Sequence, residues 1–282
     1  MIRKRREWSS AVVSSTGCTF RKKITFSYAY HLLECFFMAD TLEKDNIVIV
    51  GDKADLGSLG YMELMDSMGG DLSIVNSARV SYNKYSAEFE EKDKKLIKFL
   101  AKHRHWTPFE QNSITFRVKC PIYIARQWMK HRCWVFNEIS ARYTKFDNTI
   151  YRPDEFREQA ETNKQASVKA GDSLDQAFAG EIYDNAAKTA IDAYNKLIEL
   201  GVCREQARGV LPVGSHTEFI TTVNLRNFMH WYNLRAPKEA QWEIQQYAKA
   251  GMQLVKRVFP VAVECFEELE KESLLEVSEK GN

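Results

Sequence analysis

The order of hydrophobic and polar residues predicts short strands separated by longer helices. Residues 47–50, Ile-Val-Ile-Val, form an apolar run that ends at Gly51, as expected of a short strand. Between residues 114 and 120, apolar side chains alternate with polar ones, which is the period of a strand with one face in the core. Residues 219–223 form a further strand candidate.

Longer segments have the apolar repeat of helices. Residues 86–100 carry apolar positions at helical spacing among many charges. Pro121 suits the first turn of a helix that continues to about Trp134, and the longest helical pattern, residues 177–200, stops at Gly201. Further helices are predicted over residues 225–234 and 238–259, and an acidic helix follows from residue 264.

Together these elements predict an α/β fold with a small antiparallel sheet flanked by helices. The polar segment 152–175 is interpreted as a surface insertion or a loose helix. We find no internal repeat and no linker rich in Pro, Gly or Ser, so residues 38–282 are expected to form a single domain. Residues 1–37 are expected to be a separate extension.

Composition places the chain among globular proteins. Its 282 residues are 44% hydrophobic and 28% charged, with 13 Gly and 6 Pro, which argues against a disordered or fibrous protein. No stretch of 18 apolar residues occurs in the sequence, so we expect no membrane span.

Charge is distributed unevenly along the chain, whose formal net charge is +2. Residues 1–37 hold seven basic and two acidic residues, whereas the remainder holds 33 basic and 36 acidic residues. A protein that binds nucleic acid non-specifically needs a basic face on its folded domain, because phosphate neutralisation supplies most of that affinity. We therefore expect no nucleic acid partner.

The first 37 residues combine a basic start, a Ser/Thr-rich stretch and a mixed apolar run. His31 and Glu34 interrupt that run, so a secretory signal fits poorly. We interpret the segment as a disordered basic extension, or as the result of a start codon placed too early, with Met38 as the true first residue. An organelle transit peptide is the alternative to the expected cytoplasmic location.

The sequence lacks the motifs of several common metal-binding, nucleotide-binding and hydrolase sites. The six cysteines form no C-x-x-C pair, so we expect reduced thiols and no metal site. The patterns G-x-G-x-x-G, G-x-x-x-x-G-K-[ST] and G-x-S-x-G are also missing. A nucleotide bound by this chain is therefore not held by a Rossmann turn or a P-loop.

Residues 127–143, Q-W-M-K-H-R-C-W-V-F-N-E-I-S-A-R-Y, are the most unusual stretch of the chain. Gln127 and Lys130 are three apart, so they share a face of the predicted helix. Residues 137–142 then place amide, carboxylate, hydroxyl and guanidinium groups beside aromatic side chains. A pocket for an anionic, planar ligand needs this mixture, although a solvated helix end with a polar loop has the same composition.

Spacing and neighbouring motifs add to this interpretation. Arg132 and Ser140 have the separation of the R-H-R-x7-S signature of flavin-dependent thymidylate synthases, which the segment resembles. Residues 137–143 are similar to the family's N-E-x-S-x-R-Y. Further similar motifs follow in the same order between about residues 45 and 260: A-R-V-S at 78–81, H-W-T-P-F-E at 105–110, R-E-Q-A-R-G-V-L-P at 204–212, T-V-N-L-R at 222–226, N-L-R at 233–235 and A-Q-W-E-I at 240–244.

The resemblance implies the family's fold and its reaction, the reductive methylation of dUMP to dTMP. It also implies bound FAD, NADPH and 5,10-methylenetetrahydrofolate as co-substrates, and a homotetramer with shared active sites. The implied dUMP contacts are Gln127, Trp128, Met129, Lys130, Glu138, Ile139, Ser140, Ala141, Arg142, Arg208 and Arg235. The implied FAD contacts are Thr107, Lys130, His131, Arg132, Glu138, Asn224, Leu225, Arg226 and His230, with His105 near the flavin or the folate.

Arg235 is the expected catalytic residue, because a cation held against the pyrimidine would stabilise charge as the ring is activated. Ser140 is interpreted as a substrate contact, since the local sequence offers it no general base. Three residues depart from the family pattern: Lys130 replaces the usual arginine, Ala141 a common glycine and His230 a common amide. Lysine keeps the charge but loses the two-pronged contact of a guanidinium.

Two other functions remain open from the sequence. In a single-stranded nucleic-acid-binding module, cations such as Lys130 and Arg132 would contact phosphates beside stacking aromatic residues. The net charge of the main body argues against this function. An inactive flavin-binding relative is the other alternative, and the departure at Lys130 is the feature that supports it.

Overall fold

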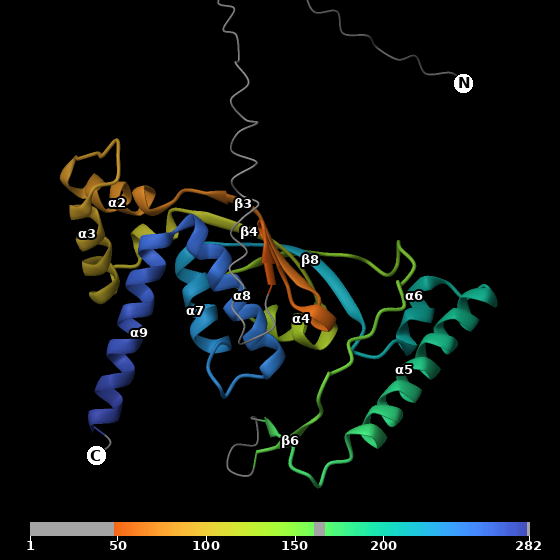
Figure 1. Cartoon of the computed structure of the whole chain (residues 1–282). Helices are drawn as coiled ribbons and strands as arrows, with labels where there is room; N and C mark the ends of the chain where they lie inside the picture. Colours follow the sequence, from red (N-terminus) through yellow and green to blue (C-terminus); the bar gives the residue numbers. More distant parts are fainter. Residues whose placement is uncertain (1–47, 161–166, 281–282) are drawn as a thin grey trace, which may run out of the picture. The chain divides into compact units, whose positions relative to one another are not determined.

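A six-stranded antiparallel sheet is the centre of the computed structural model (Figure 1). The structure describes residues 48–160 and 167–280, all within the unit Ala39–Asn282, so the interpretations of residues 1–38 lie outside it. The strand order is β1 (Val48–Val50), β2 (Lys53–Asp55), β3 (Tyr61–Met68), β4 (Ser113–Pro121), β8 (His216–Val223) and β5 (Val135–Glu138). The α/β class and the antiparallel sheet are thereby confirmed.

Two central strands have alternating buried side chains, as predicted for residues 114–120. Phe116 and Val118 of β4, and Phe219 and Val223 of β8, are buried on one face of the sheet. Helices α7 (Leu225–Arg235) and α8 (Trp242–Val258) lie against this face (Figure 1). On the other face Ile220 remains 40% exposed.

An aromatic cluster joins the buried sheet face to its helices. Trp128, at the end of α4 (Ile122–Trp128), stacks on Trp231 of α7 with ring centroids 4.5 Å apart. Trp134 packs against both indoles, Phe228 packs against Trp231 and Trp134, and all four side chains are almost fully buried. Burial of aromatic surface of this size stabilises the end of α4, from which the candidate site begins.

The remaining helices are α2 (Asp71–Arg79), α3 (Glu91–Lys102), α5 (Gln176–Glu199), α6 (Arg204–Ala207) and α9 (Pro260–Lys280). Short 3-10 turns occupy η2 (Gly57–Leu59), η3 (Val80–Tyr82), η4 (Thr107–Glu110) and η5 (Arg208–Val210). Ion pairs from Lys94 and Lys98 to Glu264 and Glu268 connect α3 to α9. In the part of the chain that the structure describes, no helix has the length and apolarity needed to cross a membrane.

Three predicted helix boundaries are wrong. The helix predicted from residue 86 begins at Glu91, because Glu90 is extended and its N–H bonds to Asp93. The helix predicted to reach about Trp134 ends at Trp128, since the chain turns and pairs as β5 with β8. The helix predicted from residue 238 begins only at Trp242.

The early end of α4 has a consequence for the candidate site. Lys130 lies beyond the helix and is exposed, so the argument that Gln127 and Lys130 share a helix face fails. The polar segment 152–175, expected to be an insertion or a loose helix, contains the hairpin β6 (Arg157–Gln159) and β7 (Ser167–Lys169).

Candidate functional site

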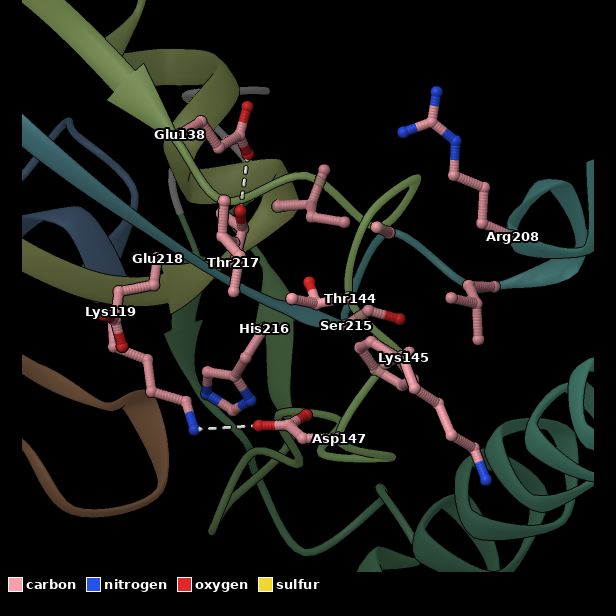
Figure 2. Close-up of a pocket in the computed structure, with 15 residues that line it drawn as sticks. Lys119, Glu138, Thr144, Lys145, Asp147, Arg208, Ser215, His216, Thr217 and Glu218 are labelled. Atoms are coloured by element: carbon pink, nitrogen blue, oxygen red, sulfur yellow. Dashed lines mark hydrogen bonds and ion pairs between the residues drawn. The ribbon is translucent and has the colours of Figure 1, made fainter. Parts of the chain in front are cut away.

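A pocket of about 260 Å³ lies where β4 ends and β8 begins (Figure 2). It combines basic, acidic and apolar side chains from four separate segments of the chain. The lining residues are Lys119, Ile122, Glu138, Ile139, Ala141, Thr144, Lys145, Phe146, Asp147, Arg208, Leu211, Ser215, His216, Thr217 and Glu218. We call this the strand-end pocket.

Glu138, the last residue of β5, points toward Thr217 of β8 in Figure 2. The Thr217 hydroxyl donates a hydrogen bond of 2.5 Å to Glu138 Oε1. Thr217 is only 6% exposed, so a side chain fixed in the sheet restrains the otherwise exposed carboxylate. The pocket therefore contains one oriented acceptor near its apolar wall.

The predicted residues that follow Glu138 form a short turn at the pocket. Ser140 Oγ accepts a hydrogen bond of 3.2 Å from the N–H of Arg142. The Arg142 guanidinium is exposed and pairs with Glu205 of α6 at 2.9 Å. Arg208 enters the lining from η5, immediately after α6. Glu138 and Arg208, which are 70 positions apart, thus line one pocket, and Arg208 is suited to an anion. Ser140 and Arg142 belong to the adjoining turn and do not line the pocket.

Several lining residues were not predicted from the sequence. Lys119 pairs with Asp147 at 3.2 Å across the pocket, and His216 Nε2 lies 3.1 Å from the carbonyl oxygens of Ser58 and Leu59. Burial lowers the pKa of His216. The sequence indicates only that Lys119 and His216 lie near the ends of strands. It does not show that these two strand ends meet at a pocket.

A second group of predicted residues surrounds Arg235, at the end of α7. The guanidinium is half-buried; its Nε–H donates to His131 Nε2 at 3.1 Å, and an Nη–H donates to the carbonyl of Gln127 at 3.4 Å. These bonds use part of the donor fork, and the other N–H groups are available to a planar ligand. We call this the Arg235 cluster.

His131 must be neutral to accept that bond, and its surroundings favour this state. Burial, and then the charges of Arg235 and His230, lower the pKa of His131 to about 4. The rings of His131 and His230 lie 6.5 Å apart, edge to face. Thus a neutral imidazole holds a cationic guanidinium in a fixed orientation.

The residues at the end of α4 and just after it have different exposures. The Trp128 side chain is fully buried in the aromatic cluster, and Met129 packs against the core. These two residues therefore present mainly backbone to a ligand. Lys130 and Arg132 are exposed. Gln127 donates a hydrogen bond from Nε2 to Gln241 Oε1, which places its amide close to the start of α8.

The third group lies around η4 and the start of α7. Arg226 forms an ion pair with Glu110, and Asn224 caps α7 by accepting the N–H of Asn227 at 2.9 Å. Leu225 is buried, so its contact with a ligand would involve its backbone. Thr107 is exposed at the start of η4, the same turn that contains Glu110.

A cavity of about 1090 Å³ borders this third group. Its lining includes Ser81, Thr107, the exposed His105 and apolar side chains such as Phe99. Arg79 also lines it, but its guanidinium pairs with the buried Asp93. The volume lies just above the range of about 300–1,000 Å³ that is usual for ligand sites, and the lining combines apolar walls with hydroxyls and an imidazole. We call this the η4 cavity.

The predicted residues therefore meet in three places within one chain. Glu138, Ile139, Ala141 and Arg208 line the strand-end pocket, whereas Arg235 does not. Among the described residues, the structure shows no group of His, Cys, Asp and Glu that could hold a metal ion. Cys120, Cys133, Cys203 and Cys265 carry free thiols, and Cys18 and Cys35 lie outside the described residues.

The fold and these sites define an α/β protein whose candidate ligand-binding residues lie at the ends of an antiparallel sheet and of its helices. Residues 63–261 match the model of the Thy1 family, described as thymidylate synthase complementing protein. Because that match covers most of the chain, the chain belongs to this family.

Relatives with known names agree with the family match. A flavin-dependent thymidylate synthase of Thermosipho melanesiensis is 45% identical over 207 residues, covering 73% of this chain and 90% of the relative. One from Thermus thermophilus is 46% identical over 209 residues, covering 74% and 76%. One from Wolbachia pipientis is 39% identical over 233 residues, with 81% of each chain covered.

Solved structures are similar as well. The UMP/dUMP methylase PolB from Streptomyces cacaoi, bound with 5-Br dUMP, superposes with a TM-score of 0.67 at 33% identity, covering 73% of this chain and 94% of PolB. Its complex with 5-Br UMP gives a TM-score of 0.66 and covers 93% of that chain. The resemblance inferred from the motifs is thus confirmed at the level of family and fold.

Proposed function

We propose that the chain is a flavin-dependent thymidylate synthase, which methylates dUMP to dTMP. The observation that carries the proposal is the Arg235 cluster, where a half-buried guanidinium is held by His131 and by the Gln127 carbonyl. A cation fixed in this way can stabilise charge on a pyrimidine without reorganising during the reaction. The named relatives and the nucleotide complexes of PolB support the same reaction.

The η4 cavity is the proposed flavin site. Of the residues proposed to bind FAD, Thr107 lines this cavity. Arg226 and His230 would bind FAD from exposed positions on α7, and Lys130, His131 and Arg132 would bind it from the segment after α4. His105 would lie near the flavin or the folate ring. Bound FAD, reduced by NADPH, supplies the hydride, and 5,10-methylenetetrahydrofolate supplies the one-carbon unit. The protein binds and orients these groups.

The dUMP site is proposed to combine the strand-end pocket with the Arg235 cluster. Arg208 and Arg142 would neutralise the phosphate, and Ser140 would contact it through its hydroxyl. Glu138, held by Thr217, offers an acceptor to the sugar. Arg235 and Gln127 would contact the pyrimidine ring.

A homotetramer with shared active sites is part of the proposal. Since Arg235 does not line the pocket that contains Arg208, the two halves of the nucleotide site can be joined by a neighbouring protomer. Val135 and Ile220, on the sheet face away from α7 and α8, are 65% and 40% exposed. Exposed apolar residues on a sheet are suited to contact a second copy of the chain.

The nucleic-acid-binding alternative is not favoured by the comparisons, because the family model and the named relatives are of thymidylate synthases. The inactive relative differs from the proposed enzyme only in turnover, which an assay decides.

Two measurements test the proposed function. Purified protein supplied with FAD should show a bound-flavin spectrum, and NADPH should bleach it. A coupled assay with dUMP, 5,10-methylenetetrahydrofolate and NADPH should then form dTMP. Absence of flavin binding would refute the proposal, whereas bleaching without dTMP would favour the inactive relative.

A further inference from the structure

A fully buried carboxylate begins α8, within the A-Q-W-E-I motif at residues 240–244. Glu243 is 2% exposed and pairs with Arg157 of β6 at 2.5 Å. Oε1 is the oxygen that pairs with Arg157, and it also accepts a hydrogen bond of 3.4 Å from the Tyr151 hydroxyl. Oε2 accepts a hydrogen bond of 2.9 Å from Gln241 Nε2. A buried carboxylate needs such partners, because an unpaired one would be strongly destabilised.

Glu243 determines the orientation of the Gln241 amide. An ionised carboxylate only accepts hydrogen bonds, so the NH2 group of Gln241 must face Glu243. The Oε1 of Gln241 then faces away from Glu243, toward Gln127. This orientation follows from the chemistry of the carboxylate and does not depend on how the two ends of an amide are assigned.

The same reasoning extends to Gln127. Because Gln241 presents an oxygen, the NH2 group of Gln127 must donate to it, as the structure shows. The Oε1 of Gln127 is thereby left as an acceptor for a ligand. Gln127 is half-buried and lies next to Arg235, which donates to its backbone carbonyl at 3.4 Å.

We infer that Glu243 and Gln241 are positioning residues that fix the amide of Gln127 with its oxygen toward the bound nucleotide. This inference rests on the proposed function and extends it to residues that do not touch substrate. The imide edge of uracil carries one N–H donor between two carbonyl acceptors. An amide oxygen from Gln127 and N–H donors from Arg235 form a complementary pair for such an edge.

The test uses Gln241→Met in the FAD-loaded enzyme, with dUMP binding measured by calorimetry. Methionine keeps the length of the side chain and removes both ends of the amide. The helix should not depend on this side chain, since Gln241 makes no capping hydrogen bond to α8. Loss of one oriented hydrogen bond should raise the Kd for dUMP about fivefold to tenfold, with flavin binding unchanged.

Gln245→Met is the matched control. Gln245 lies one turn further along α8, and its amide bonds to the carbonyls of Ala240 and Lys238 at 2.6 and 3.4 Å, without contacting Gln127. This variant should bind dUMP as the unmodified enzyme does. Equal dUMP affinities for Gln241→Met and the unmodified enzyme would overturn the inference.

A double-mutant cycle distinguishes loss of the orientation of Gln127 from a non-specific effect of Gln241→Met on the structure. In a Gln127→Ala background, Gln241→Met should cause no further loss of dUMP affinity, because the oriented amide is already absent. Additive losses would overturn the inference, even if the single variant binds weakly. If the unmodified FAD-loaded enzyme binds no dUMP, the proposed function itself fails.

Discussion

At the scale of single residues, Arg235 is the side chain on which the proposed chemistry depends most. Arg235→Ala should lower kcat for dTMP formation about 100-fold to 1000-fold, because a fixed cation near the developing charge is lost. Arg235 is hydrogen-bonded to one proposed flavin contact, His131, but the flavin spectrum should persist because the contacts at η4 and the start of α7 remain. Arg126→Ala, which removes an exposed arginine of α4, is the control. Normal turnover of Arg235→Ala would refute the assigned role.

His131 should make the stability of the flavin-free protein depend on pH. Its pKa is lowered from 6.5 to about 4 in the folded state, so the unfolded state binds more protons between these values. The contribution of neutral His131 to the free energy of unfolding is complete above pH 6.5 and is lost as the pH falls toward about 4. The free energy of unfolding, measured with urea at several pH values in this window, should rise less steeply with pH for His131→Gln than for the unmodified protein.

The role of His131 is measured by the difference between the two proteins in how the free energy of unfolding changes with pH. Burial also lowers the pKa of His216, which adds a pH dependence of the same sign to both. Identical slopes with and without His131 would contradict the neutral, buried imidazole that accepts from Arg235.

The motif residues were predictable at this scale, and their supporting residues were not. Glu138 and Arg208 were chosen from short sequence patterns, and they line one pocket. Thr217 and Gln241 restrain predicted residues through contacts across 79 and 114 positions. Thr217 belongs to no predicted motif, and the motif at 240–244 assigns no contact to Gln241, so only the pairing of strands and helices identifies what these two residues restrain.

At the scale of elements, the contact between α2 and α3 depends on one buried ion pair. Arg79 of the A-R-V-S motif pairs with Asp93 at 2.5 Å, and the side chain of Asp93 is fully buried. Arg79→Met should lower the free energy of unfolding by about 3 kcal/mol, because it leaves a buried carboxylate without its cation. Urea unfolding of the flavin-free protein measures this change.

An exposed ion pair provides the comparison. Lys196 and Glu199 of α5 pair at 3.2 Å with side chains 69% and 66% exposed. Lys196→Met should change the free energy of unfolding by less than about 1 kcal/mol, since solvent screens the pair. Equal effects of the two substitutions would show that burial of Asp93 does not control the docking of α3.

Elements with a regular apolar period were predicted well. β4 alternates along its whole length, and α5 spans Gln176–Glu199 and is followed by Gly201 at φ 85°, close to the predicted bounds. β3 was missed because Met62 is its only fully buried residue, so no alternation is visible. β5 was missed because a four-residue edge strand depends on pairing with β8.

At the scale of the whole molecule, the residues proposed for the nucleotide site lie in two regions of the protomer. Arg208 lines the strand-end pocket, and Arg235 lies with His131 and Gln127 at the ends of α7 and α4. The sequence predicted both groups, but it gives no distances between segments and no arrangement of subunits. The shared site expected from the family resemblance therefore stays a prediction, which mixing of variants can test.

Arg208→Ala and Arg235→Ala should each be inactive alone and should complement one another when mixed. If each site takes Arg208 from one protomer and Arg235 from another, random reassembly of equal amounts restores both arginines in about a quarter of the sites. Mixed, dissociated and reassembled protein should then regain about a quarter of the activity. A mixture of Arg235→Ala with the double variant is the control and should stay inactive. No recovery in the first mixture would show that both arginines must come from the same chain.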